Sequence, residues 1–319
     1  MFNHINNKES IKGEQAAFDH QILDRINNGH IPDLRYPNRN EWFYNNVWRD
    51  PQFVKMSFLE NINFLNKYLQ PNSKILEVGC GPGHNSLELA RNGHHVVSLD
   101  LSPECIKIAN KTLVNNIYTE NFGSLNYLCG DFLEMDIPNA PYDAVFFYGA
   151  LSHFPDIDSV IDKVSNLLRS SGKILIYDTG VDVYNENDAL IFFIIRSLLS
   201  LTGHYYENNC IPSDEKSLEQ EINTILSYLR YTNNDGVNVQ SPNDNSQTYN
   251  TMIPALAKKF EQDLFIPDCC FYRNIIGGIR SENKNKEYEI AAFIKLLDSY
   301  LTQRNRLSSA FFYYVGKKR

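Results

Sequence analysis

The segment from Ile75 to Asp100, ILEVGCGPGHNSLELARNGHHVVSLD, constrains the fold more than any other part of the chain. An apolar run enters a loop with Gly79, Gly81 and Gly83, a helical pattern follows, and a second apolar run ends at Asp100. Glycine has no Cβ, so the loop backbone can adopt positive φ and approach a ligand closely. The Asp100 carboxylate can accept hydrogen bonds from both hydroxyls of a ribose. The segment therefore predicts a β-α-β unit that binds an adenosine-containing ligand.

The glycine spacing indicates which adenosine ligand the loop suits. A dinucleotide site reads GxGxxG, with its third glycine packing the helix on the strand and the helix N-terminus holding a pyrophosphate. This loop reads GxGxG with Pro82 inside it, and Glu77 lies two residues before the first glycine. A carboxylate there would repel phosphate groups but suit a sulfonium or an ammonium. The loop therefore favours a cationic ligand.

The run ILEVGCGPG, followed by VVSLDLSPECIKIA, resembles motif I and its successor in class I S-adenosylmethionine-dependent methyltransferases. The resemblance is to small-molecule enzymes similar to those of ubiquinone and menaquinone biosynthesis. It implies S-adenosyl-L-methionine as the cofactor and S-adenosyl-L-homocysteine as the product. The loop residues expected to bind the cofactor are Glu77, Gly79, Cys80, Gly81 and Gly83.

The same resemblance assigns roles further along the chain. It implies that Asp100 holds the ribose hydroxyls and that Leu101 lies against the adenine. Asp131 matches the position whose carboxylate accepts from the adenine amino group, and Phe132 would supply its backbone amide. Tyr148 ends the fourth apolar run, at the edge of a parallel sheet where ligands bind, so we expect it to face the cofactor through its backbone.

From Lys74 onward the pattern alternates strand and helix, which predicts a parallel, doubly wound sheet. Five strands are expected, at residues 74–79, 95–100, 125–132, 144–151 and 173–180. The terminal FFYYVGKK resembles the last strand of the methyltransferase sheet, which is antiparallel. We therefore expect an α/β fold with a Rossmann-like, seven-stranded sheet, a helical N-terminal cap and a helical insertion after the fifth strand. The expected segments are 1–72 for the helical cap, 73–180 for the cofactor-binding core, 181–262 for the substrate-lid insertion and 263–319 for the completion of the sheet.

Three local patterns carry further expectations. The run LIFFIIRSLLSL is interrupted by Arg196 and is shorter than the roughly 20 apolar residues of a membrane span, so it predicts a buried amphipathic helix. SLEQEINTILSYLR places Ser217 and Gln220 in capping-box spacing at a helix start. Cys269 and Cys270 would fall on opposite faces of a strand.

Composition limits the partners. The chain has 38 acidic residues against 30 Lys and Arg, a net charge of −8, which disfavours nucleic acid. The six cysteines lack metal-ligand spacing, so reduced, mostly buried thiols and no metal are expected. The N-terminus lacks the apolar core of a secretory signal, so a cytoplasmic location is expected. The expected partner is a small-molecule acceptor. No membrane span is expected, and the sequence leaves open whether the chain forms a homo-oligomer.

Methyl transfer from a sulfonium is an in-line displacement that depends mainly on alignment and dehydration. His153, in LSHFPD, resembles a histidine that many small-molecule methyltransferases carry near the departing methyl group, and it is the candidate general base. The alternative is a structural histidine that caps the next helix. Asp178, which follows the fifth strand, and the pair His204 and Tyr205 are candidates for substrate contact.

The N-terminal run WFYNNVWR contains aromatic rings that could cover a sulfonium by cation–π attraction, and Tyr44 is the chosen candidate. Plain hydrophobic packing is the alternative. The fourth strand has FYGALSHF in place of the Pro-Pro-Tyr sequence of amide and base nitrogen methyltransferases. O-methylation of a small molecule is therefore the leading hypothesis, with N- or C-methylation next. A NAD-dependent oxidoreductase and a non-catalytic S-adenosylmethionine-binding partner protein are the rival classes.

Overall fold

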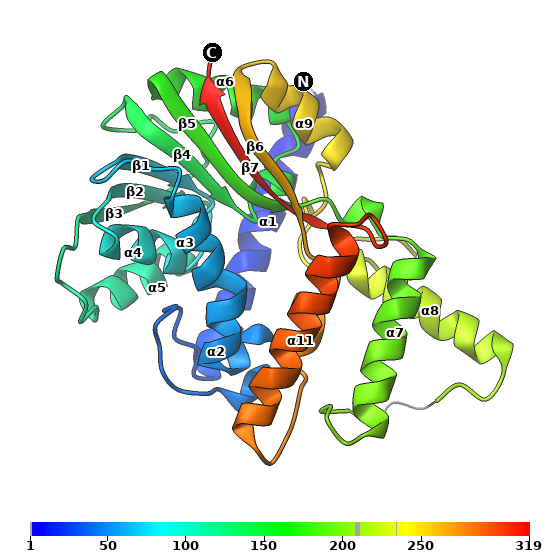
Figure 1. Ribbon diagram of the computed structural model, residues 1–319. Helices are drawn as coiled ribbons and strands as arrows, with labels where there is room; N and C mark the ends of the chain where they lie inside the picture. The colour runs from blue at the N-terminus through cyan, green and yellow to red at the C-terminus, as the bar shows by residue number, and fades with distance from the viewer. Residues whose placement is uncertain (1, 208–210, 234) are drawn as a thin grey trace.

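The computed structural model describes residues 2–207, 211–233 and 235–319, and its centre is one seven-stranded sheet (Figure 1). The strand order is β3-β2-β1-β4-β5-β7-β6. Strands β1 to β5 pair in parallel, whereas β7 runs antiparallel to both of its neighbours. The strands are β1 Lys74–Val78, β2 His95–Asp100, β3 Ser124–Cys129, β4 Tyr142–Tyr148, β5 Leu168–Thr179, β6 Phe260–Asp268 and β7 Phe311–Lys318. The predicted α/β sheet with a last antiparallel strand is confirmed.

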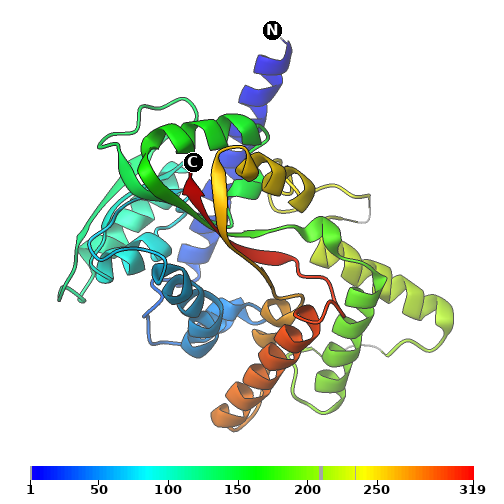
Figure 2. The ribbon, with the colours of Figure 1, turned by 45° about the horizontal axis from the view of Figure 1, so that its top comes forward.

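Alternate side chains of the strands enter two apolar layers, one on each face of the sheet. On β4, Phe146 belongs to one buried cluster and Phe147 to the other, as period-two alternation requires. Figure 2 shows α6 and α9 on one side of the sheet and α3 and α11 on the other. The helices are α1 Phe2–Asn27, α2 Pro51–Val54, α3 Glu60–Asn66, α4 His84–Arg91, α5 Pro103–Val114, α6 Ile157–Leu167, α7 Glu186–Leu201, α8 Glu215–Leu229, α9 Tyr249–Ala257, α10 Tyr272–Ile276 and α11 Lys284–Thr302.

The helix starts follow local capping chemistry. Ser102 caps α5, accepting from the Cys105 backbone N–H at 3.0 Å, and Pro103 occupies the first turn. The start predicted for α8 is wrong. Asp214 is the N-cap, and Ser217 is the third helical residue of the capping box, because the Asp214 carboxylate accepts from the Ser217 backbone N–H.

The cysteine pair lies differently from the prediction. Strand β6 ends at Asp268, so Cys269 and Cys270 follow it and do not alternate across its faces. Both are buried, and Asp298 of α11 accepts from the backbone N–H of Cys270 at 2.8 Å. Cys210 lies outside the described residues.

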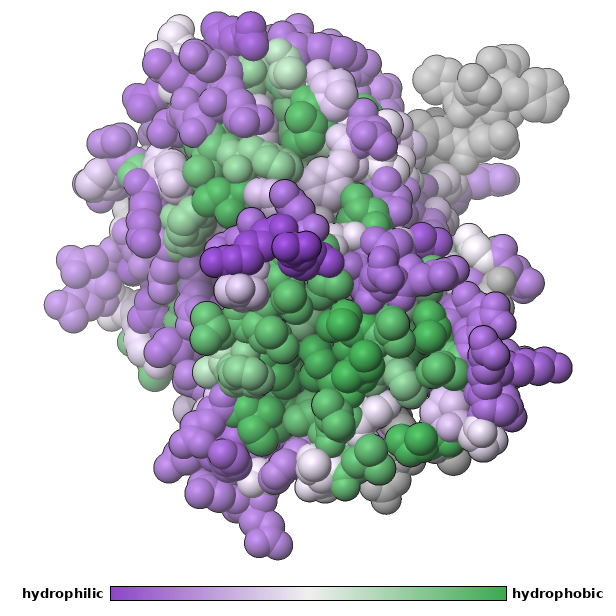
Figure 3. All heavy atoms as spheres, turned by 45° about the vertical axis from the view of Figure 1, so that its right-hand side comes forward, coloured by the Kyte–Doolittle hydropathy of each residue, from purple (hydrophilic) through white to green (hydrophobic). Residues whose placement is uncertain are grey.

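Helix α7 is less buried than its sequence predicts. Leu190, Ile194, Leu198 and Leu201 recur at helical spacing and are exposed, so only the opposite face of α7 packs on the molecule. Figure 3, which brings the side of α7 and α11 forward, shows a broad apolar area there. Among the described residues, no helix has the length and apolarity needed to cross a bilayer.

Candidate functional site

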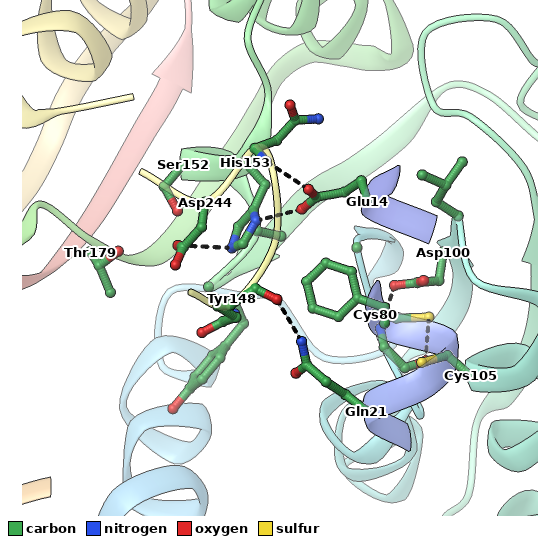
Figure 4. Close-up of a pocket in the computed structure, with 18 of the residues that line it drawn as sticks. Glu14, Gln21, Cys80, Asp100, Cys105, Tyr148, Ser152, His153, Thr179 and Asp244 are labelled. Carbon is green, nitrogen blue, oxygen red and sulfur yellow. Dashed lines mark hydrogen bonds and ion pairs between the residues drawn. The ribbon is translucent and has the colours of Figure 1, made fainter. Parts of the chain in front are cut away.

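A cavity of about 530 Å³ opens where the carboxyl ends of β1, β2 and β4 meet the N-terminal helix α1. This volume lies in the range of small-molecule sites. In Figure 4, Glu14 and Gln21 of α1 lie on one side of the cavity. Asp100, Tyr148 and His153, which belong to the strands and the loop after β4, lie on the other side. The far wall comes from the segment after β5, through Tyr228, Tyr231, Gln240, Asn243 and Asp244. The cavity therefore joins the glycine loop to parts of the chain distant in sequence.

The glycine loop leaves room for a ligand at Gly81. Gly81 has φ of +51°, and a Cβ added there would meet no atom within 4 Å. At Gly79, φ is +73° and an added Cβ would lie 2.6 Å from the Ala150 Cβ. A side chain at Gly81 would therefore occupy the open space of the loop, and one at Gly79 would collide with Ala150. Gly83 does not line the cavity; an added Cβ there would lie 2.3 Å from the Tyr127 hydroxyl, so this glycine serves packing.

Asp100 is held rigidly at the end of β2. Its Oδ2 accepts from the Gly81 backbone N–H at 2.7 Å, and its Oδ1 accepts from the Ser102 backbone N–H at 2.8 Å. Burial raises the pKa of the Asp100 carboxyl, and these two backbone hydrogen bonds oppose the shift. Asp100 and Leu101 both line the cavity. The remaining lone pairs of Asp100 are available for ribose hydroxyls.

Glu77, predicted to bind the cofactor, is buried beneath the loop and is not among the residues that line the cavity. Its Oε2 accepts a hydrogen bond from the Ser86 hydroxyl of α4. Burial raises the pKa of Glu77 to about 8, and the charge of Asp100 adds to this shift. The free protein therefore holds Glu77 mainly in its neutral form at pH 7.

Asp131, Phe132, Cys80 and Tyr148 all line the cavity, as the cofactor hypothesis requires. Asp131 Oδ1 also accepts from the Leu133 backbone N–H at 2.8 Å, so it closes a turn as well. The Tyr148 hydroxyl is engaged by α3 and its neighbourhood, donating to the Ser57 carbonyl and accepting from Asn61, both at 3.1 Å. Its hydroxyl is therefore already engaged by protein partners.

His153 lines the cavity between two carboxylates (Figure 4). Its Nδ1 lies 2.8 Å from Glu14 Oε1, and its Nε2 lies 3.9 Å from Asp244 Oδ1. Burial lowers the pKa of His153, but the hydrogen bond to Glu14 and the charges of Asp244 and Glu14 outweigh it and raise the pKa. Burial raises the pKa of Glu14, yet the hydrogen bond and charge of His153 give a net lowering. His153 and the two acids therefore form one coupled acid–base cluster.

The structure places the substrate-contact candidates outside the cavity lining. Asp178 is fully buried, and its Oδ2 accepts from the backbone N–H groups of Ala150, Leu151 and Ser152 at 2.7 to 3.3 Å. It therefore clamps the loop that carries His153. His204 Nδ1 lies 3.1 Å from the Arg280 carbonyl oxygen, and Tyr205 packs against Tyr206. None of the three candidates is in the lining.

Tyr44 also lies outside the cavity. Its side chain is 53% exposed and packs edge-on against Tyr206. Trp48, from the same aromatic run, lines the cavity instead and packs against Phe58 and His84. Asn46 accepts from the Trp48 backbone N–H and starts the short turn Val47–Arg49 that directs Trp48 inward.

Sequence reasoning missed five charged residues of the cavity: Asp156, which is the N-cap of α6, and four others. Of these four, three come from the caps and one from α10: Glu14, Arg25, Asp244 and Arg273. A signal existed for Glu14 and Arg25, because Ile11, Glu14, Phe18, Gln21, Ile22 and Arg25 recur at helical spacing along α1. Polar side chains on an otherwise apolar helical face indicate a site. Asp244 and Arg273 lie in stretches with no such periodicity.

Residues 76–176 match the family described as a methyltransferase domain. A sterol 24-C-methyltransferase of Gibberella zeae is 30% identical over 125 residues, covering 38% of this chain and 31% of the relative. A ubiquinone biosynthesis O-methyltransferase of Xylella fastidiosa is 33% identical over 106 residues, covering 33% of this chain and 41% of the relative. The matches thus span only 31% and 41% of the lengths of these two curated relatives.

Two solved structures share the fold along nearly the whole chain. The cyclase SpnF has a TM-score of 0.52 at 12% identity, covering 97% of this chain and 96% of that one. A putative sarcosine dimethylglycine methyltransferase from Galdieria sulphuraria has a TM-score of 0.51 at 13% identity, with 94% and 97% covered. The sheet order, the GxGxG loop with open space at Gly81, and Asp100 at the end of β2 agree with the matched family. Residues 76–176 therefore carry a methyltransferase domain, within a sheet whose fold these two structures share.

Proposed function

We propose that the protein methylates an oxygen atom of a small-molecule acceptor. The observation that carries the proposal is a single cavity lined both by the donor-binding residues Gly81 and Asp100 and by the acid–base cluster of His153. A bound sulfonium donor supplies an electrophilic methyl group. The chain's own contribution is to align the acceptor, to exclude water and to take up a proton.

In this proposal His153 removes the proton of the acceptor hydroxyl through Nε2. Glu14 accepts from Nδ1–H and thereby fixes the tautomer that leaves Nε2 free. When His153 becomes cationic, Glu14 and Asp244 stabilise the charge from its two sides. A hydroxyl benefits from such a base more than an amine, which is nucleophilic without it, and this favours oxygen over nitrogen.

We propose further that the N-terminal cap and the segment after β5 act as a lid. Ile11, Phe18 and Ile22 of α1 line the cavity opposite the glycine loop, and Tyr228 and Tyr231 close it from the other side. Apolar walls of this kind remove water from the reacting groups and strengthen the electrostatic effects of the acid–base cluster. Acceptor selection would then reside in these two segments, 1–72 and 181–262.

The test uses the full chain with methyl-labelled S-adenosylmethionine and a panel of small phenols, carboxylic acids, amines and activated carbons. Labelled methyl ethers or esters are the expected products, and labelled amines or C-methylated products would replace the oxygen assignment. His153→Gln should lower kcat strongly while leaving S-adenosylhomocysteine affinity unchanged. His95→Gln is the matched control, because His95 is exposed on β2 and outside the cavity. Binding of NAD without binding of S-adenosylhomocysteine would contradict the whole proposal.

A further inference from the structure

Arg273, the second residue of α10, projects its guanidinium into the cavity among aromatic rings. Its Cζ lies 4.9 Å from the ring centroids of Phe58 and Phe311 and 5.6 Å from that of Tyr177. Nη1 donates to the Tyr177 hydroxyl at 3.3 Å. The rings hold the plane of the guanidinium by cation–π attraction while leaving most of its N–H groups free to meet a ligand.

Within residues 2–207, 211–233 and 235–319, no carboxylate lies at ion-pair distance from Arg273, and Tyr177 is its one hydrogen-bond partner. Arg91, which is buried, shows the usual arrangement, with Asp33 Oδ1 at 2.6 Å from Nη1, whereas Arg273 is half-buried in the cavity wall. The carboxylate beyond Tyr177, that of Asp268, accepts from the Tyr177 hydroxyl at 2.8 Å. A half-buried cation among aromatic rings with no counter-ion is well placed to receive an anion that enters the cavity, so this arrangement indicates that a ligand supplies the anion.

The position of Arg273 in the fold indicates which ligand this is. The donor-binding residues follow β1, β2 and β3, whereas Tyr177 and Phe311 belong to β5 and β7. In the order β3-β2-β1-β4-β5-β7-β6, β5 and β7 are two and three strands from β1. At about 4.8 Å between neighbouring strands, that is roughly 10 to 14 Å across the sheet. Arg25 of α1 lines the donor side of the cavity and is available for the carboxylate of the donor itself.

We propose that Arg273 binds a carboxylate or phosphate group of the methyl acceptor. This inference rests on the proposed function and narrows its substrate class to anionic small molecules with an apolar body that fits between the rings. The guanidinium fork suits either oxyanion through two parallel hydrogen bonds. The backbone that precedes Arg273 is held in place, because Asp298 accepts from the backbone N–H groups of Cys270, Phe271 and Tyr272 at 2.7 to 2.8 Å.

The test measures binding of benzoate, phenyl phosphate and neutral benzamide to the full chain saturated with S-adenosylhomocysteine, by calorimetry. We expect the two anions to bind at least about tenfold more tightly than benzamide. Arg273→Gln should abolish that preference, and Arg273→Lys should retain part of it through its charge. Arg304→Gln is the control, because Arg304 lies on Tyr300 at the end of α11, outside the cavity. Equal binding of benzoate and benzamide to the wild-type chain overturns the proposal, even if the Arg273→Gln variant does not fold.

A second measurement separates the two sources of an anion. S-adenosylhomocysteine carries a carboxylate, whereas 5′-methylthioadenosine does not. Unchanged affinity of Arg273→Gln for both compounds agrees with an acceptor-binding role. A loss of about tenfold for S-adenosylhomocysteine alone assigns Arg273 to the donor carboxylate and overturns the acceptor assignment. If the wild-type chain binds neither compound, the proposed methyl transfer itself fails, while the preference for benzoate over benzamide, measured without the nucleoside, still tests the anion site.

Discussion

The Glu14 carboxylate lies 2.8 Å from His153 Nδ1, although 139 residues separate them in sequence. The pair joins α1 to the loop after β4, and Ser241 donates to the same Glu14 oxygen at 2.8 Å. Three segments that would otherwise be independent thus meet at one carboxylate. The N-terminal helix is held over the cavity by a polar contact as well as by its packing on α5.

This pair predicts a stability maximum at mildly acid pH. The raised pKa of His153 stabilises the fold below the ordinary histidine value of 6.5, and that contribution is lost as pH rises through the folded-state pKa. The lowered pKa of Glu14 stabilises the fold above the ordinary value of 4.5, and that contribution is lost as pH falls. Glu14→Gln should therefore cost about 1 to 2 kcal/mol near pH 6 and less at pH 9.

Thermal unfolding between pH 4 and pH 9 checks this prediction. Glu60→Gln is the control, because Glu60 forms an exposed ion pair with Lys295 at 2.8 Å that should contribute little. A pH-independent difference between Glu14→Gln and the wild type would mean that Glu14 acts by packing rather than by charge.

Replacing Asp100 should weaken cofactor binding without unfolding the loop. Asp100→Ala removes the acceptor for the Gly81 and Ser102 N–H groups as well as the ribose contact, at a cost to binding on the order of 1 to 3 kcal/mol. Calorimetry with S-adenosylhomocysteine measures this loss. Asp162→Ala, in an exposed ion pair with Lys259, is the control and should bind as the wild type does. An unchanged dissociation constant in Asp100→Ala would remove Asp100 from the ribose.

The clamp at Asp178 predicts a loss of stability rather than of substrate affinity. Asp178→Ala leaves the buried N–H groups of Ala150, Leu151 and Ser152 without an acceptor. We expect a loss of roughly 2 to 4 kcal/mol in the free energy of unfolding, measured in urea. Thr179→Val, which changes the neighbouring side chain that lines the cavity, is the comparison. A fully stable Asp178→Ala variant with a raised KM would instead restore the substrate-contact role.

The sheet could be predicted from the sequence because its signals are local. The apolar runs of the strands, the glycine loop and the Ser102–Pro103 start of α5 each act within a few residues, and the structure confirms these elements. The polar wall of the cavity could not be predicted in the same way. Asp244 and Arg273 reach it only through tertiary packing of segments that lack periodicity, and Asp178 is drawn away from it by three backbone N–H groups.

The aromatic run of the cap shows the same limit. WFYNNVWR contains several aromatic rings, any of which could line the site by its residue type alone. Which ring does so depends on two short turns that Asn40 and Asn46 cap. These turns expose Tyr44 and direct Trp48 inward. Pattern alone predicts that an aromatic ring covers the site, but not which one.

The two tryptophans make this placement measurable. Trp48 lines the cavity, whereas Trp42 lies outside the lining and is 39% exposed. Ligand binding should therefore change the tryptophan fluorescence of the wild type and of Trp42→Phe. It should leave the fluorescence of Trp48→Phe unchanged. A ligand-dependent fluorescence change that persists in Trp48→Phe and disappears in Trp42→Phe would show that Trp42, and not Trp48, lies next to the ligand.

Glu77 predicts a proton release when the cofactor binds. Burial holds the pKa of Glu77 at about 8, so the carboxyl is mainly neutral at pH 7 in the free protein. An ammonium bound at the loop above it would favour the carboxylate and expel the proton. The heat of S-adenosylhomocysteine binding at pH 7 should then depend on the ionisation enthalpy of the buffer. Glu77→Gln should lose this dependence, and 5′-methylthioadenosine, which has no ammonium, should not produce it.

The same residue sets the pH dependence of the free protein. Because the folded-state pKa of Glu77 is raised from 4.5 to about 8, its neutral form stabilises the fold at low pH, and stability falls as pH rises between those values. Glu77→Gln keeps an acceptor for Ser86 and cannot ionise, so its unfolding free energy should exceed that of the wild type at pH 7 by on the order of 2 to 3 kcal/mol. Two results together would contradict this prediction: a binding heat of the wild type that does not depend on the buffer, and a difference in unfolding free energy from Glu77→Gln that does not depend on pH. They would show that Glu77 is already ionised in the ligand-free protein.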